Sequence, residues 1–223
     1  MESRNACDRS VQYILRGQYD AALRQLDGAK SSGASPADVE NLRGLALMLQ
    51  GKLQPALSSF ARALELQPSL QEALYNRGLA LLRTGRYEAA SADFERLWKD
   101  ASSTLRADAA YHNGIALDRL GRHADAESWL SRAFELDPQL DGALLYIGML
   151  RERKGDLQGA GRAYLDYLAR HPNSATAALR FGLAAHRAGR SDVARRYLQQ
   201  VVDSSPGSLD AHEARKFLVM WGE

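Results

Sequence analysis

The 223-residue chain contains a single cysteine, Cys7, so it cannot build an internal disulfide framework. It has no apolar run that approaches the roughly 18 residues of a membrane-spanning helix. Its charges nearly cancel, with 29 basic and 27 acidic side chains. A nucleic-acid-binding surface needs a strong excess of positive charge to contact phosphates. We therefore expect neither a transmembrane span nor a nucleic-acid partner.

Motifs of catalysis are missing as well. The sequence has no phosphate-binding loop of the form G-x-x-x-x-G-K-[ST], no G-x-S-x-G, no C-x-x-C and no H-E-x-x-H. Its histidines are not spaced as metal ligands are. We therefore expect no catalytic residue, no metal site and no cofactor, and we predict that the chain is not an enzyme.

What the sequence does contain is an internal repeat. One row of glycines recurs every 34 residues, with one interval of 36: Gly17, Gly51, Gly85, Gly121, Gly155 and Gly189. A second row lies seven residues earlier, and Ser10 takes its place in the first unit: Gly44, Gly78, Gly114, Gly148 and Gly182. After each glycine of the first row come an alanine and then a large apolar residue, such as Ala56 and Phe60. Four units end near a proline: Pro68, Pro138, Pro172 and Pro206.

Each of these repeated positions has a physical reason. A glycine between two apolar-periodic stretches can adopt a positive φ and end the first helix of a pair. A glycine inside a helix costs roughly 0.5–1 kcal/mol relative to alanine, so the second row indicates that two helix backbones approach closely there. A proline cannot continue a helix and therefore closes the second one.

This pattern resembles the tetratricopeptide repeat (TPR) family, most clearly in the third unit, where Gln71–Leu81 is followed by Thr84–Ala90 and Phe94. The resemblance implies an all-α fold, a right-handed TPR superhelix of six helix-turn-helix repeats plus a C-terminal capping helix. We expect a single solenoid over residues 3–221, with units 3–36, 37–70, 71–104, 107–140, 141–174 and 175–208 and a capping helix at 209–221.

Three local departures from the repeat bear on its structure. Leu105 and Arg106 are inserted after the third unit, where Ser102 also replaces the proline, and we expect an altered step there. Ser35 and Pro36 have the pattern of a helix start, with a capping serine and a proline at the first helical position. Ser10, in place of glycine, indicates an N-terminal cap or a loosely packed first helix.

In TPR proteins the first helices of the hairpins line a concave groove. The repeat register implies that the fifth, sixth and ninth positions of each unit face it. The predicted partner-binding residues are Tyr75, Asn76, Leu79, Tyr111, His112, Ile115, Leu145, Tyr146, Met149 and Arg180. One interpretation is a groove for an extended or helical segment of a partner protein. The other is ordinary solenoid core, which we favour for Val11, Leu45 and Leu183, whereas tyrosine and methionine suit an adaptable contact surface.

A row of arginines ends four of the first helices: Arg83, Arg119, Arg153 and Arg187. These side chains either form a charged surface that orients a ligand or complement the negative end of the helix dipole. We favour the second interpretation. A chaperone-tail clamp is not expected, because Asp108 stands where that clamp needs a basic residue and would repel a carboxylate.

Within the TPR family the chain is similar to the pilotin-type biogenesis proteins of type IV pili, which are six-unit lipoproteins that help the outer-membrane secretin assemble. The similarity lies in the six units, the two-residue insertion and the segment Ser205–Asp210. It implies a non-catalytic scaffold and assembly factor. The alternative is a cytoplasmic TPR adaptor or regulatory module that binds an enzyme or a signalling partner. As the chain stands we expect a cytoplasmic location, or an outer-membrane lipoprotein facing the periplasm if a leader was removed.

Overall fold

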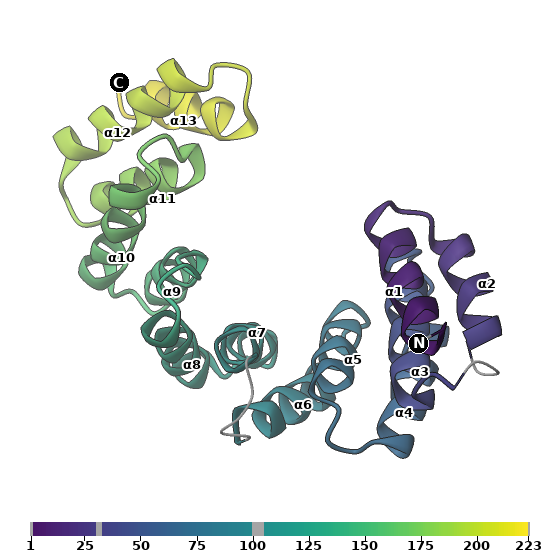
Figure 1. The fold of residues 1–223 in the computed structure, drawn as a ribbon. Coiled ribbons are helices and arrows are strands. Elements are labelled where there is room, and N and C mark those ends of the chain that lie inside the picture. Colours follow the sequence, from purple (N-terminus) through teal and green to yellow (C-terminus); the bar gives the residue numbers. More distant parts are fainter. Residues whose placement is uncertain (1, 30–32, 100–104, 223) are drawn as a thin grey trace. The chain divides into compact units, whose positions relative to one another are not determined.

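In the computed structural model, residues 2–29, 33–99 and 105–222 are described. Within these ranges the chain forms helices joined by short turns and contains no strand (Figure 1). The helices are α1 (Glu2–Leu15), α2 (Tyr19–Ala29), α3 (Pro36–Leu49), α4 (Leu53–Leu66), α5 (Gln71–Arg83), α6 (Tyr87–Lys99), α7 (Arg106–Arg119), α8 (His123–Leu136), α9 (Gly142–Arg153), α10 (Leu157–Arg170), α11 (Ala175–Arg187), α12 (Ser191–Ser204) and α13 (Leu209–Met220). This confirms the all-α solenoid of paired helices with an extra C-terminal helix.

The first row of glycines ends the first helix of each pair, as predicted. All six have a φ between 71° and 80°, in the left-handed region that glycine adopts without strain. At Gly51 the backbone hydrogen bonds identify a Schellman motif, because Gly51 N donates to Met48 O and Lys52 N donates to Leu47 O. The chain therefore reverses at these turns without leaving the last carbonyls of the helix unpaired.

Three glycines of the second row, Gly44, Gly78 and Gly148, each make room for an aromatic ring. A Cβ added at Gly44 would lie 2.5 Å from the Phe60 ring, and one added at Gly148 would lie 2.3 Å from the Tyr164 ring. Both rings are fully buried between the two helices of their hairpin. The expectation of close packing holds, but the neighbour that excludes a side chain is the ring of the large apolar residue rather than a second backbone.

The chain divides into two compact units, Met1–Ala126 and Glu127–Glu223. The boundary falls inside α8 and not at the Leu105–Arg106 insertion. In the first unit the first helices contact one another in succession, α1 with α3, α3 with α5 and α5 with α7. In the second unit α9 contacts α11, and α11 contacts α13. In each unit the first helices of neighbouring hairpins thus share one side.

The predicted departures have clear local structures. Ser35 caps α3 by accepting a hydrogen bond from Asp38 N, with Pro36 at the first position, as predicted. Ser10 is fully buried and its hydroxyl donates to Ala6 O at 2.9 Å, so the serine is accommodated within a packed first helix. Within the insertion, the Arg106 guanidinium lies 4.6 Å from the centre of the Trp98 ring. The position of Ser102 lies outside the described residues.

The last helix covers the sixth hairpin. Ala211 and Ala214 of α13 are fully buried, and Phe217, Leu218 and Trp221 pack against the core of the second unit. The Trp221 ring stacks on His186 of α11 at 3.5 Å between ring centres. Val219 and Met220 remain largely exposed. Among the described residues, no helix has both the length and the apolar character needed to cross a bilayer.

Candidate partner-binding face

The predicted binding residues all lie on first helices, and within each unit we call the side that its first helices share the inner face. In the first unit it comprises Tyr75, Asn76, Leu79, Tyr111, His112 and Ile115, together with Asn41. In the second unit it comprises Leu145, Tyr146, Met149 and Arg180. The ten predicted residues are neither fully buried nor fully exposed. Each of them can therefore hold its place in the fold and still offer surface to a partner.

In the first unit, polar side chains connect successive first helices. Asn76 Nδ2 donates to Asn41 Oδ1 at 3.0 Å, which joins α5 to α3. Tyr75 Oη lies 3.5 Å from His112 Nδ1, at the equivalent point between α5 and α7. Asn41 is the fifth residue of its unit, one of the positions expected to face the groove, but its pairing with Asn76 was not predicted. The first contact fixes the amide groups on the inner face, and the second places the Tyr75 hydroxyl beside the His112 ring.

An aromatic cluster lies at the same place. The Tyr75 ring is 6.2 Å from Phe94 and 5.6 Å from His112, edge to face in both cases, and Tyr111 approaches His112 in the same way at 5.2 Å. Phe94 is fully buried in the hairpin core, whereas the other three are half-buried. Tyr75 and His112 therefore rest on the core and keep part of their surface accessible. Leu79 packs against the same core.

The titratable groups of this cluster are neutral near pH 7. Burial lowers the pKa of His112, and the nearby Asp108 only partly offsets that effect. His112 Nδ1 lies 2.9 Å from the Asp108 carbonyl oxygen, which can only accept, so Nδ1 carries the ring proton. Burial, with a smaller contribution from the Asp108 charge, raises the pKa of Tyr75 to about 12. This part of the inner face offers hydrogen bonds and apolar surface without charge.

The second unit presents a different surface, in which charge is concentrated. Leu145 and Met149 pack against its core. Met149 and Arg180 also line a cavity of about 350 Å³, whose other walls are Glu152, Arg153 and Arg187. Two of the predicted residues thus meet in one cavity between α9 and α11, and Tyr146 lies half-buried on the same helix as Met149.

Glu152 makes the polar contacts that join the walls of this cavity, although no motif in the sequence marks it. Its side chain is only 7% exposed. Its carboxylate accepts a hydrogen bond from Tyr164 Oη at 2.9 Å and pairs with Arg187 at 2.7 Å and, more loosely, with Arg180 at 3.9 Å. Burial and the charge of Glu152 raise the pKa of Tyr164, so its hydroxyl stays a donor. Arg187, assigned to the helix dipole from its position, in fact reaches across to α9.

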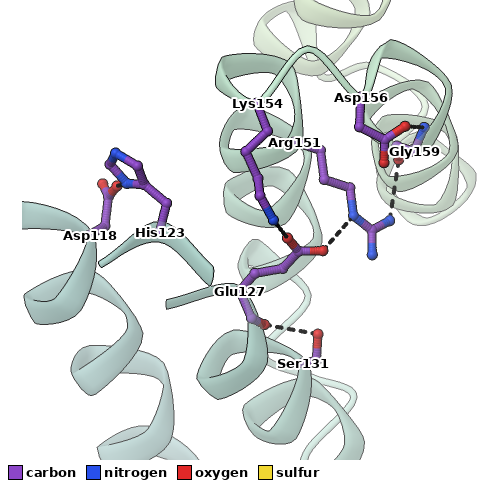
Figure 2. A network of polar contacts seen from close by, with 8 residues as sticks. All are labelled: Asp118, His123, Glu127, Ser131, Arg151, Lys154, Asp156 and Gly159. Carbon is purple, nitrogen blue, oxygen red and sulfur yellow. Dashed lines mark hydrogen bonds and ion pairs between the residues drawn. The ribbon is translucent and has the colours of Figure 1, made fainter. Parts of the chain in front are cut away.

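The charged side chains next to Glu152 in the sequence form contacts within the fold. Figure 2 shows Arg151 between three helices, where it donates to Glu127 of α8 at 2.7 Å and to the Gly159 carbonyl of α10 at 3.3 Å. Lys154 adds a second contact to Glu127 at 3.3 Å. Asp156 caps α10 by accepting from Gly159 N. This network holds α8, α9 and α10 together and leaves the next side chains of α9 to line the cavity.

In the first unit Figure 2 also shows an ion-pair geometry at the end of α7. His123 Nδ1 lies 2.9 Å from an Asp118 carboxylate oxygen. Asp118 is buried and occupies the position in its repeat that Glu152 occupies in the next one. Across the described residues, no three histidine, cysteine, aspartate or glutamate side chains are grouped so that they could hold a metal ion. The geometry of the inner face suits contact with another molecule.

Comparison with known sequences and structures agrees with this architecture. The profile of the tetratricopeptide repeat family matches residues 16–71, 42–104, 75–141 and 143–209. The chain belongs to the tetratricopeptide repeat family. No curated protein matches the sequence.

Among solved structures, this TPR chain is similar to PilW, a widely conserved type IV pilus biogenesis factor. The TM-score is 0.84 at 22% identity, over 96% of this chain and 98% of PilW. PilF of Pseudomonas aeruginosa has a TM-score of 0.81 at 21% identity, over 97% and 99% of the two chains. YrrB, a TPR protein with an unusual peptide-binding site, has a TM-score of 0.70 at 24% identity, over 86% and 97%. At these identities the likeness establishes the fold.

Proposed function

We propose that this chain is a non-catalytic scaffold that binds an extended or helical segment of a partner protein on its inner face, and that it acts in assembly of the type IV pilus secretin. The binding role is carried by one observation. Aromatic, amide and guanidinium side chains recur on the first helices, are half-buried, and are held by contacts between neighbouring hairpins. Such preorganised side chains lose little conformational entropy when a partner binds.

The pilus role is supported by the extent of the structural likeness. PilW and PilF are matched over almost their whole length and over almost the whole of this chain. In this role the protein lies on the periplasmic side of the outer membrane. The alternative is a cytoplasmic adaptor for an enzyme or a signalling protein, and fractionation of native cells distinguishes the two locations.

The binding role is tested by placing charge on the inner face. Tyr75→Glu, Tyr111→Glu and Met149→Glu are each expected to lower capture of the purified secretin subunit at least about tenfold, because each places a charge on a surface proposed to be desolvated on binding. Leu66→Glu and Leu136→Glu are matched controls, since these leucines are 44% and 50% exposed on second helices. Circular dichroism verifies that every variant remains folded. Undiminished capture by folded inner-face variants would contradict the proposal.

The pilus role has its own readout in the native organism. Deletion of the gene is expected to reduce the amount of multimeric secretin in the outer membrane, measured by immunoblot, and the wild-type gene should restore it. Normal secretin multimers in the deletion strain, together with inner-face-dependent capture of an enzyme or a signalling protein, would replace the pilus role with the adaptor role.

A further inference from the structure

The cavity of the second unit lies between the first helices of two consecutive hairpins. Met149, Glu152 and Arg153 come from α9, and Arg180 and Arg187 come from α11. Its volume of about 350 Å³ holds several non-hydrogen atoms, which is more than a bound water needs. Because Met149 and Arg180 belong to the inner face, a segment bound there passes the cavity.

The charge of Glu152 is already compensated inside the protein. Its carboxylate accepts one hydrogen bond from the hydroxyl of the fully buried Tyr164 and another from the guanidinium of Arg187. One arginine and one tyrosine satisfy a carboxylate that is 7% exposed. The packing of Glu152 therefore does not account for a second guanidinium in the same cavity.

Arg180 is that second guanidinium. Its nearest Glu152 oxygen lies at 3.9 Å, beyond hydrogen-bond length, and its side chain is 41% exposed. Among the described residues no hydrogen bond engages its guanidinium, so its N–H groups are available to a ligand. Glu127, another acid of this unit, is engaged by Arg151 and Lys154. In the lining, the guanidinium groups of Arg180 and Arg187 lie beside the single carboxylate of Glu152.

An anion reduces the repulsion between neighbouring guanidinium groups, and a carboxylate matches their paired N–H geometry. We propose that this cavity binds the carboxylate of an aspartate or glutamate side chain within the partner segment. Arg180 holds the carboxylate, Arg187 shares its charge, and Met149 contacts the methylene stem. The proposal rests on the proposed partner-binding function and specifies the chemistry of the partner at this point.

One feature favours an acidic side chain over a phosphate group. Met149 gives one wall an apolar surface, which suits the methylene group that precedes an acidic side chain's carboxylate. The partner segment is therefore expected to carry an aspartate or glutamate flanked by apolar residues.

The direct test is a titration of the ¹⁵N-labelled full chain with N-acetyl-glutamate N-methylamide, whose side chain carries its only charge. Saturable shifts are expected at the Nε–H resonances of Arg180 and Arg187. The glutamine analogue should bind at least about tenfold more weakly, since hydrogen bonds to charged groups contribute that much. N-acetyl-leucine, which has only a terminal carboxylate, and inorganic phosphate should also bind more weakly. No saturable shift, or equal binding of any of these three probes, overturns the proposal.

Variants identify the residue responsible. Arg180→Gln keeps the Glu152–Arg187 pair and should still fold, while its affinity for the glutamate probe falls about tenfold. Arg180→Lys retains the charge without the paired donors and should have an intermediate affinity. Arg162→Gln is the matched control, because Arg162 is exposed on the second helix α10. Unchanged affinity in the Arg180→Gln variant contradicts the assignment.

The experiment separates failure of this proposal from failure of the proposed function. If Tyr75→Glu abolishes secretin capture but Arg180→Gln affects neither probe binding nor capture, the inner face binds a partner and the acidic-residue assignment is wrong. If the probe binds through Arg180 but no inner-face variant affects capture, the proposed function fails, and with it the assignment of the cavity to a partner segment.

Discussion

Tyr164 serves the fold and the candidate site at once. Its ring fills the space left by Gly148 inside a hairpin, and its hydroxyl donates to Glu152 on the side where the cavity lies. The Cδ1 and Cε1 atoms of the ring lie closest to the glycine, and the hydroxyl reaches the carboxylate at 2.9 Å. A substitution that moves this ring should therefore affect both stability and the position of Glu152.

Gly148→Ala tests this double role. The added Cβ would lie 2.3 Å from a fully buried ring, and overpacking of this kind typically costs about 1–3 kcal/mol. We expect the free energy of unfolding to fall by that amount in urea titrations. Gly28→Ala is the control, because a Cβ there meets no atom within 4 Å and alanine favours the helix. A Gly148→Ala variant as stable as the Gly28→Ala variant would refute the packing account.

His112 gives the first unit a pH dependence whose sign follows from its burial. Because burial holds the folded pKa of His112 below the usual histidine pKa of about 6.5, the unfolded chain binds the proton more readily. The contribution to stability is present above pH 6.5 and is lost as the pH falls through that value toward the folded pKa. We expect the free energy of unfolding of the wild type, measured in urea, to fall from about pH 7.5 to about pH 5.5. The fall should be smaller for His112→Gln.

The control for this measurement is His212→Gln, since His212 is exposed on α13. Its stability should vary with pH as the wild type does. If His112→Gln retains the full pH dependence of the wild type, protonation of His112 is not what weakens the fold in this range.

At the scale of the element, α13 covers the sixth hairpin. It supplies Phe217, Leu218 and Trp221 to the core that α11 and α12 otherwise leave open. Its start is fixed by Ser208, which accepts from Ala211 N, and by a hydrogen bond from Thr176 to Asp210. Arg195 of α12 donates to the Trp221 carbonyl at the other end. Both ends of α13 are thus attached to the sixth hairpin.

Removing residues 209–223 is expected to destabilise that hairpin. Full burial of one large apolar side chain contributes about 1.5–3 kcal/mol, so loss of three half-buried ones should cost about 2–4 kcal/mol. At this chain length that lowers the Tm by roughly 4 °C or more, and the exposed core should reduce solubility. Differential scanning calorimetry measures the shift.

Point substitutions provide the matched comparison. Trp221→Ala removes the ring that stacks on His186, whereas Val219→Ala shortens a side chain that is 69% exposed. Only the first should lower the Tm appreciably. A truncated chain with an unchanged melting curve would show that α13 does not stabilise the hairpin beneath it.

The elements also show what the sequence could and could not reveal. The glycine turns and the Ser35 start were predictable because a positive φ and an N-terminal cap are decided within a few residues. The role of Glu152 was not, because it depends on Tyr164 of one helix and Arg187 of another. The one signal in the sequence was that Glu152 directly precedes an arginine of the repeated row. That signal is not specific, because Asp118 has the same position in its repeat and pairs with a histidine.

At the scale of the whole molecule, the repeat places one kind of surface on every hairpin, but its chemistry changes along the chain. In the first unit the inner face carries neutral aromatic and amide groups around Tyr75 and Asn76. In the second unit it carries the arginine-lined cavity around Arg180. The register predicted which positions share a side. It did not predict that charge would gather in one unit, because that depends on which side chains meet across neighbouring helices.

The central claim, that a partner lies along the inner face, is tested most directly by site-specific photocrosslinking in native cells. A benzophenone amino acid placed at Tyr75 or Met149 is expected to crosslink the secretin, identified by mass spectrometry. The same group placed at Leu66 or Leu136, which are exposed on second helices, is expected to give none. Crosslinks from the second helices, with none from Tyr75 and Met149, would contradict the account.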